Sequence, residues 1–126
     1  MEQYELKKEV LSSALEYIER VLPGVEEIIE CFQTGREDRA TNMMIDLIEG
    51  IQWLIQAIDG TKDVQGEHSI DTSQINSVLN QLVEAYENMD YVLLSDLLEY
   101  ELLPLAKTWK EKLVGIQGVL ENDSQK

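Results

Sequence analysis

Among the side chains that could carry catalysis or bind a metal, the sequence has 25 Asp and Glu residues, one cysteine (Cys31) and one histidine (His68). A di-iron site in a helical protein needs two Glu-x-x-His motifs, and a tetrahedral zinc site needs several Cys or His ligands. One histidine and one cysteine cannot supply either set. A Cys-His nucleophilic pair would require Cys31 and His68 to meet, and nothing in their spacing predicts that.

The carboxylates and the glycines offer no reaction site either. Asp46, Glu49 and Asp96 point away from the apolar stripes of their predicted helices, which is typical of a solvated face. The glycines are isolated in the sequence, so they do not form the loop that cradles a phosphate. We therefore predict no catalytic, cofactor-binding or metal-binding residues and no cofactor, and we expect that the protein is not an enzyme.

The length and the net charge bound the remaining classes of function. The chain has 126 residues, 44% of them hydrophobic, and a formal charge of −15, which suits one domain with a single core. A strongly negative protein repels nucleic acid unless it has a basic patch, and we find no such patch. With one cysteine, no signal segment and no apolar run that approaches a membrane span, we expect a cytoplasmic protein without a membrane partner.

Apolar residues recur at helical spacing through long stretches that contain few Gly and Pro. This pattern predicts an all-α fold, an antiparallel up-down four-helix bundle. The expected helices cover about 3–33, 36–59, 71–89 and 91–116. Residues 60–70 have two glycines and no apolar periodicity, so we expect a long loop there. Residues 1–121 then form a single domain, and residues 122–126 form a polar tail.

Two prolines fall inside the predicted helices. The apolar phase runs through Pro23 unchanged, which favours one long first helix with a kink; two helices that meet at Pro23 are the alternative. Pro104 predicts a second kink, in the last helix. Asp90 is suited to cap the start of that last helix, and Asp71 is suited to cap the start of the third.

Several large apolar side chains are left over once this core is assigned. Trp53 projects away from the apolar face of its helix. Leu93, Leu97, Tyr100 and Leu103 lie outside a stripe on the last helix that is already complete. We predict that these five residues bind another protein, either an amphipathic helix or a second copy in a homodimer. The alternative is that the bends at the prolines cover this surface within the monomer.

Several segments together resemble a known family. They are GIQWLIQAID at 50–59, a glycine-containing loop, a helix with Leu79, Leu82 and Tyr86, then Asp90, LEYELL at 98–103 and KTWKE at 107–111. Over roughly residues 40–113 the spacing and residue classes resemble the flagellar export chaperones. The resemblance implies a small cytosolic helical bundle that binds the C-terminal part of flagellin. The first helix departs from the family's N-terminal segment, and the family's tyrosine-containing stretch is reduced to Tyr86.

The run DYVLLSDLLEYELLPL at 90–105 also looks like segments of uncharacterised small helical proteins from Gram-positive bacteria. Three functions from different classes remain. The first is an interaction module or secretion-type chaperone, which holds a helical segment while the negative charge keeps the complex soluble. The second is a structural homodimer, and the third is a small-molecule-binding helical protein with a pocket between the helices.

Overall fold

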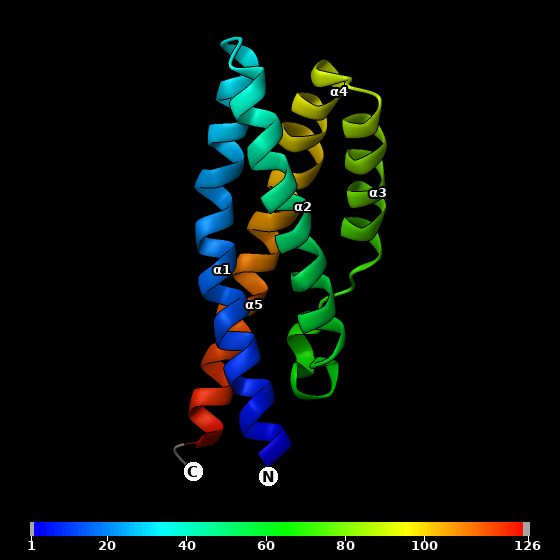
Figure 1. Cartoon of the computed structure of the whole chain (residues 1–126). Coiled ribbons are helices and arrows are strands. Elements are labelled where there is room, and N and C mark those ends of the chain that lie inside the picture. The colour runs from blue at the N-terminus through cyan, green and yellow to red at the C-terminus, as the bar shows by residue number, and fades with distance from the viewer. Residues whose placement is uncertain (1, 125–126) are drawn as a thin grey trace.

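The computed structural model describes residues 2–124, with side chains up to position 121, and every regular element in that range is helical (Figure 1). The all-α prediction is confirmed. The chain forms α1 (Glu2–Gln33), α2 (Glu37–Asp59), the short η1 (Lys62–Val64) and η2 (Gly66–His68), then α3 (Ser73–Glu87), α4 (Tyr91–Asp96), η3 (Leu97–Leu102) and α5 (Leu103–Ser124). The last three follow one another without a gap, so they make one helical run.

The long helices lie alongside one another (Figure 1). α1 packs against both α2 and α5, while α3 packs against α2, α4 and η3. One cluster of buried apolar side chains draws on all of these helices. The α1–α2 turn and the α3–α4 turn lie at one end of the molecule, and the loop after α2 lies toward the other end, where the N- and C-terminal segments also meet (Figure 1).

Pro23 does not end the first helix, because α1 continues through it to Gln33. A proline supplies no backbone N–H, so one carbonyl in the preceding turn loses its helical partner. Side chains on both sides of the proline are nevertheless buried at helical spacing: Ile18, Val21, Val25 and Ile28. Their burial explains why one helix forms instead of the two that were the alternative.

The last helix was predicted over about 91–116 with a kink at Pro104, and in the structure the stretch before Pro104 is not a regular α-helix. Residues 97–102 form a π-helical turn, and the N–H of Leu103 donates to the carbonyl of Leu98, five residues back. Pro104 has no N–H to donate, so the wider turn lies where an α-helical bond would be missing. Leu97 and Leu98 are both buried as a result, together with Leu94 and Leu102.

The last helix is also longer than the predicted end near residue 116, since α5 continues to Ser124. Ile116 and Leu120 are buried. They continue the apolar stripe past Gly115 and Gly118, so their burial outweighs the low helix propensity of glycine. The predicted polar tail therefore begins as helix at positions 122–124, and positions 125–126 lie outside the described residues.

The loop at 60–70 is built around a buried polar side chain. Gln65 is 2% exposed, and its amide nitrogen donates to the Ile58 carbonyl oxygen at 2.8 Å and to the Thr61 hydroxyl oxygen at 3.0 Å. Its amide oxygen accepts from the Ile70 N–H at 3.0 Å. Gln65 thus links the end of α2 to Ile70, which lies shortly before α3. The spacing of apolar residues in the sequence could not predict this link.

Two aspartates act near helix starts, one as predicted and one shifted along the chain. The Asp90 side chain accepts from the N–H of Leu93 at 3.1 Å, which confirms it as the cap of α4. Asp71 accepts from the N–H of Ser73 at 2.9 Å, but α3 begins only at Ser73 rather than at the predicted residue 71. Asp71 therefore stabilises the turn that leads into α3.

Candidate functional site

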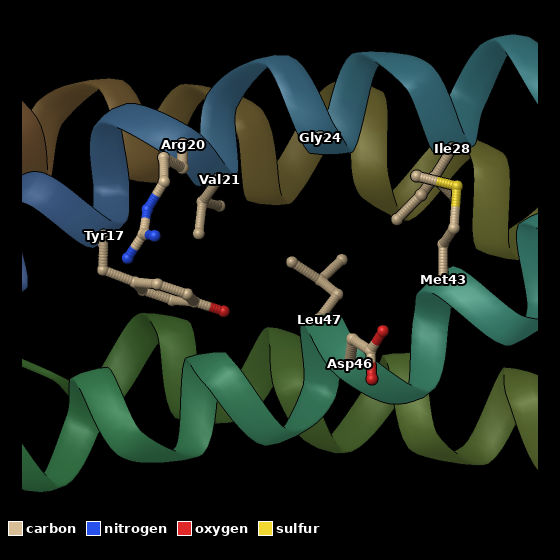
Figure 2. A pocket seen from close by; sticks show the side chains of 8 residues that line it. All are labelled: Tyr17, Arg20, Val21, Gly24, Ile28, Met43, Asp46 and Leu47. Atoms are coloured by element: carbon tan, nitrogen blue, oxygen red, sulfur yellow. The ribbon is translucent and has the colours of Figure 1, made fainter.

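A surface groove of about 190 Å³ lies between α1 and α2 (Figure 2). Its inner wall is apolar, because Val21, Ile28 and Leu47 are buried members of the core. Leu47 and Val21 face the space between the two helices, and Met43 meets Ile28 at one end (Figure 2). The lining residues are Tyr17, Arg20, Val21, Gly24, Ile28, Met43, Asp46 and Leu47.

Two features of α1 shape this groove. At Gly24 nothing lies within 4 Å of where a Cβ atom would sit, so the missing side chain leaves open space. Tyr17 closes the other end of the groove, about two helical turns before Gly24 in α1 (Figure 2). The groove is therefore defined by a small residue in the middle and an aromatic residue at its end.

Tyr17 can lie against α2 because position 50 is glycine. A Cβ atom at Gly50 would lie 1.4 Å from the hydroxyl oxygen of Tyr17, so no larger residue fits with the ring in this place. The Tyr17 ring contacts the Trp53 ring edge to face, with centroids 5.8 Å apart and planes at 80°. Gly50 and Trp53 together seat the tyrosine at the end of the groove.

The polar groups of the groove carry opposite charges. Arg20 lies over the Tyr17 ring, 5.8 Å from its centroid, and Asp46 is exposed on α2, as its position in the sequence predicted. Burial raises the pKa of the Tyr17 hydroxyl; the nearby Arg20 lowers it and the nearby Asp46 raises it to lesser extents. Tyr17 is therefore a neutral hydrogen-bonding group at ordinary pH, between one cation and one anion.

The five residues predicted to bind a partner differ in their exposure and in the helices that carry them. Trp53 is 41% exposed and touches the groove through Tyr17. Leu93 and Tyr100 are exposed, at 43% and 68%, but they belong to the last helical run. Leu103 is partly buried against the core.

Leu97 is a correction, since it is only 6% exposed and belongs to the core. The prediction placed it outside the apolar stripe by assuming a regular turn of 100° per residue. The π-helical turn of η3 starts at Leu97 and changes that phase. A wider turn lets neighbouring residues face the core together, so Leu97 is unsuited to contact a partner.

Sequence reasoning missed the groove, although one signal could have pointed to it. Tyr17, Arg20 and Met43 carry no pattern of their own. Gly50 lies in the middle of a predicted helix, where glycine is unfavourable unless another group approaches closely. An aromatic residue on the neighbouring helix is the natural group to seek, and the structure places Tyr17 there.

The groups considered for catalysis or metal binding stay apart. Cys31 is buried in the last turn of α1, while His68 lies in the loop toward the opposite end of the molecule (Figure 1). The His68 ring packs closely on Gly115 of α5, where a Cβ atom would lie 2.8 Å from it. Across residues 2–124, no group of three or more His, Cys, Asp or Glu side chains could hold a metal ion. None of the helices in this range is long and apolar enough to cross a membrane.

Comparison with known protein families finds a match. Residues 9–112 match the family described as Domain of unknown function (DUF8042). Because the match covers most of the chain, the chain belongs to this family. No curated protein matches the chain. No solved structure matches it either.

Proposed function

We propose that this member of the DUF8042 family is a non-enzymatic protein-interaction module that holds a helical segment of another protein. The observation that carries the proposal is the open apolar groove between α1 and α2. Val21, Ile28 and Leu47 already belong to the core, so a partner side chain in the groove would extend that core. Burying one large apolar side chain in this way contributes about 1.5–3 kcal/mol to binding.

The size and rim of the groove favour a side chain over a free small molecule. Its volume of about 190 Å³ is below the roughly 300–1,000 Å³ that is typical of small-molecule pockets. Arg20 and Asp46 lie at its edge with opposite charges, so they can fix the orientation of a partner backbone or of polar neighbours.

The form of the module that we favour is a cytoplasmic chaperone-like binder of the flagellar or secretion type, following the resemblance of residues 40–113. The proposal takes the helices as an antiparallel up-down bundle with kinks at Pro23 and Pro104. The chain directions in Figure 1 and the π-helical turn before Pro104 support that arrangement. Membership of the Gram-positive group of small helical proteins would leave the binding role unchanged and alter only the partner.

The test fills the groove without disturbing the core. Gly24→Leu places a side chain into the open space at Gly24 and should prevent capture of partner proteins from native cytosol. Gly118→Leu is the matched control, because Gly118 is also helical, is exposed and has nothing within 4 Å of a Cβ atom. Partners that the wild type and Gly118→Leu retain, and Gly24→Leu loses, support the proposal. Equal capture by all three proteins contradicts it.

Two further measurements separate the alternatives. Trp53→Glu should also abolish capture while circular dichroism shows unchanged helicity, because Trp53 packs on the tyrosine that closes the groove. If Trp53→Glu unfolds the protein, Trp53 is a structural residue. Light scattering of the purified protein tests the homodimer, which requires a mass of twice 14.4 kDa.

A further inference from the structure

A second hollow lies at the end of the molecule that carries the α1–α2 turn, between the last turn of α1 and α4. Its volume is about 280 Å³, and it shares no lining residue with the α1–α2 groove. The inference drawn from it therefore goes beyond the proposed function. The residues that matter are Phe32, Glu37, Tyr91, Val92, Ser95 and Asp96.

Two aromatic rings give this hollow an apolar wall. The Phe32 and Tyr91 rings stack with centroids 5.6 Å apart and planes at 23°. Val92 beside them is 76% exposed, and Leu93 is 43% exposed. Next to these apolar groups stand the carboxylates of Glu37 and Asp96, both exposed. An apolar wall beside carboxylates suits a side chain with an aliphatic stem and a cationic end.

Among the residues that the structure describes, no lysine or arginine lines this hollow. Residues 63–106 contain nine Asp and Glu and no Lys or Arg. The nearest arginines in sequence are already paired: Arg36 with Glu30 at 3.9 Å, and Arg39 with Glu27. Within residues 2–124, neither Glu37 nor Asp96 has an ion-pair partner.

We infer that this hollow binds an arginine side chain from a basic, amphipathic segment of a partner protein. The guanidinium pairs with Glu37 and Asp96, its stem and plane lie on the Phe32 and Tyr91 rings, and apolar residues of the segment cover Val92 and Leu93. Arginine suits the site better than lysine, because its planar, weakly hydrated group both stacks on rings and pairs with carboxylates. A second copy of this chain is a poor occupant, since both copies would bring negative charge to the interface.

The test uses synthetic peptides with the full-length protein. The probe is a short acetylated and amidated helical peptide of Leu, Ala and Arg, and its control replaces Arg by citrulline, which keeps the shape and removes the charge. The arginine peptide should shift the NMR amide signals of residues 91–96 and bind more weakly as salt rises. The citrulline peptide should leave those signals in place. Equal binding of both peptides overturns the inference.

Variants of the protein locate the site. Glu37→Gln and Asp96→Asn should each weaken binding of the arginine peptide by about 2- to 5-fold, as expected for exposed ion pairs. The control is Glu9→Gln with Glu16→Gln, which removes exposed charges on α1 about 24 Å or more from Phe32 along the helix. If the control weakens binding as much as the double variant Glu37→Gln with Asp96→Asn, the attraction is only that of the net charge and the inference fails.

The groove variant separates this inference from the proposed function. Gly24→Leu should bind the arginine peptide with unchanged affinity, because Gly24 does not line the hollow. Retained peptide binding together with lost partner capture supports both proposals. Absent peptide binding in the wild type, with partner capture intact, overturns the arginine site and leaves the groove proposal standing.

Discussion

The groove between α1 and α2 and the loop at 60–70 use their side chains in opposite ways. In the loop, the polar side chains of Thr61 and Gln65 are buried and hydrogen-bond neighbouring groups. In the groove, the apolar side chains of Val21 and Leu47 border open space. The polar loop thus forms hydrogen bonds within the protein, while the two amphipathic helices leave apolar side chains beside open space. Polarity of the sequence alone does not say which region is free to bind.

The largest expected effect comes from breaking the loop. Gln65→Leu leaves the Ile70 N–H without its partner in a buried place, whereas the Ile58 carbonyl keeps its hydrogen bonds from Thr61. We expect a loss of about 1–3 kcal/mol in the free energy of unfolding, the cost of one buried unpaired group. Urea unfolding followed by circular dichroism measures it. Gln56→Leu, on the exposed face of α2, is the control and should change stability by only about 0.5 kcal/mol.

A smaller effect is expected where the two helices of the groove touch most closely. Gly50→Ala should destabilise the protein by about 1 kcal/mol, because displacing Tyr17 costs more than the helix propensity that alanine adds. The same change in a Tyr17→Ala background should instead stabilise the protein. A double-mutant cycle from unfolding curves measures this reversal. The same sign in both backgrounds would show that Tyr17 does not restrict position 50.

A substitution in the open part of the groove should stabilise the protein, whereas the loop substitution destabilises it. Gly24→Ala is expected to stabilise the protein by about 0.5–1 kcal/mol, since alanine favours the helix and meets no neighbour within 4 Å. Gly118→Ala on α5 should give a similar gain and provides the reference. Thermal unfolding of both variants measures the difference. Destabilisation by Gly24→Ala alone would mean that the groove is already filled.

The smallest expected effect is on how stability depends on pH, through Asp71 at the end of the loop. Hydrogen bonds from Ser73 lower the pKa of the Asp71 carboxyl below its usual value of 3.8. A carboxyl with a lowered pKa stabilises the fold above that usual value, and the contribution is lost as pH falls through the folded-state pKa. Acidification below pH 4 should therefore cost the wild type slightly more stability than Asp71→Asn. Identical acid curves would show that the charge of Asp71 does not contribute.

The amphipathic helices could be predicted from the sequence because their core positions recur at regular spacing. Ile18, Val21, Val25 and Ile28 keep this spacing through Pro23, so the pattern outweighed the proline, and the structure agrees. The two short 3₁₀ turns could not be found in this way. They depend on Gln65, whose three hydrogen bonds reach seven residues back and five residues forward.

The spacing of apolar residues in the last helical run indicates the π-helical turn, but this is missed when a regular α-helix is assumed throughout. Leu94, Leu98, Leu102 and Ala106 are all buried, and they follow one another at three successive spacings of four. In a regular α-helix those twelve residues would turn about 1,200°, which is 120° past three full turns. A wider turn is needed to keep them on one face. The candidate site itself was beyond periodicity, because a groove depends on what is missing at Gly24 and on how Tyr17 is seated.

The π turn also has a consequence for how relatives of this chain should be compared. Such a turn contains more residues than an α-helical turn that covers the same arc, and it arises when a helix absorbs one inserted residue. A relative with a regular helix at this place must therefore lack one residue between the equivalents of Leu94 and Ala106 to keep both in the core. An alignment without that gap would place every later residue of the helix, Trp109 included, one position out of register.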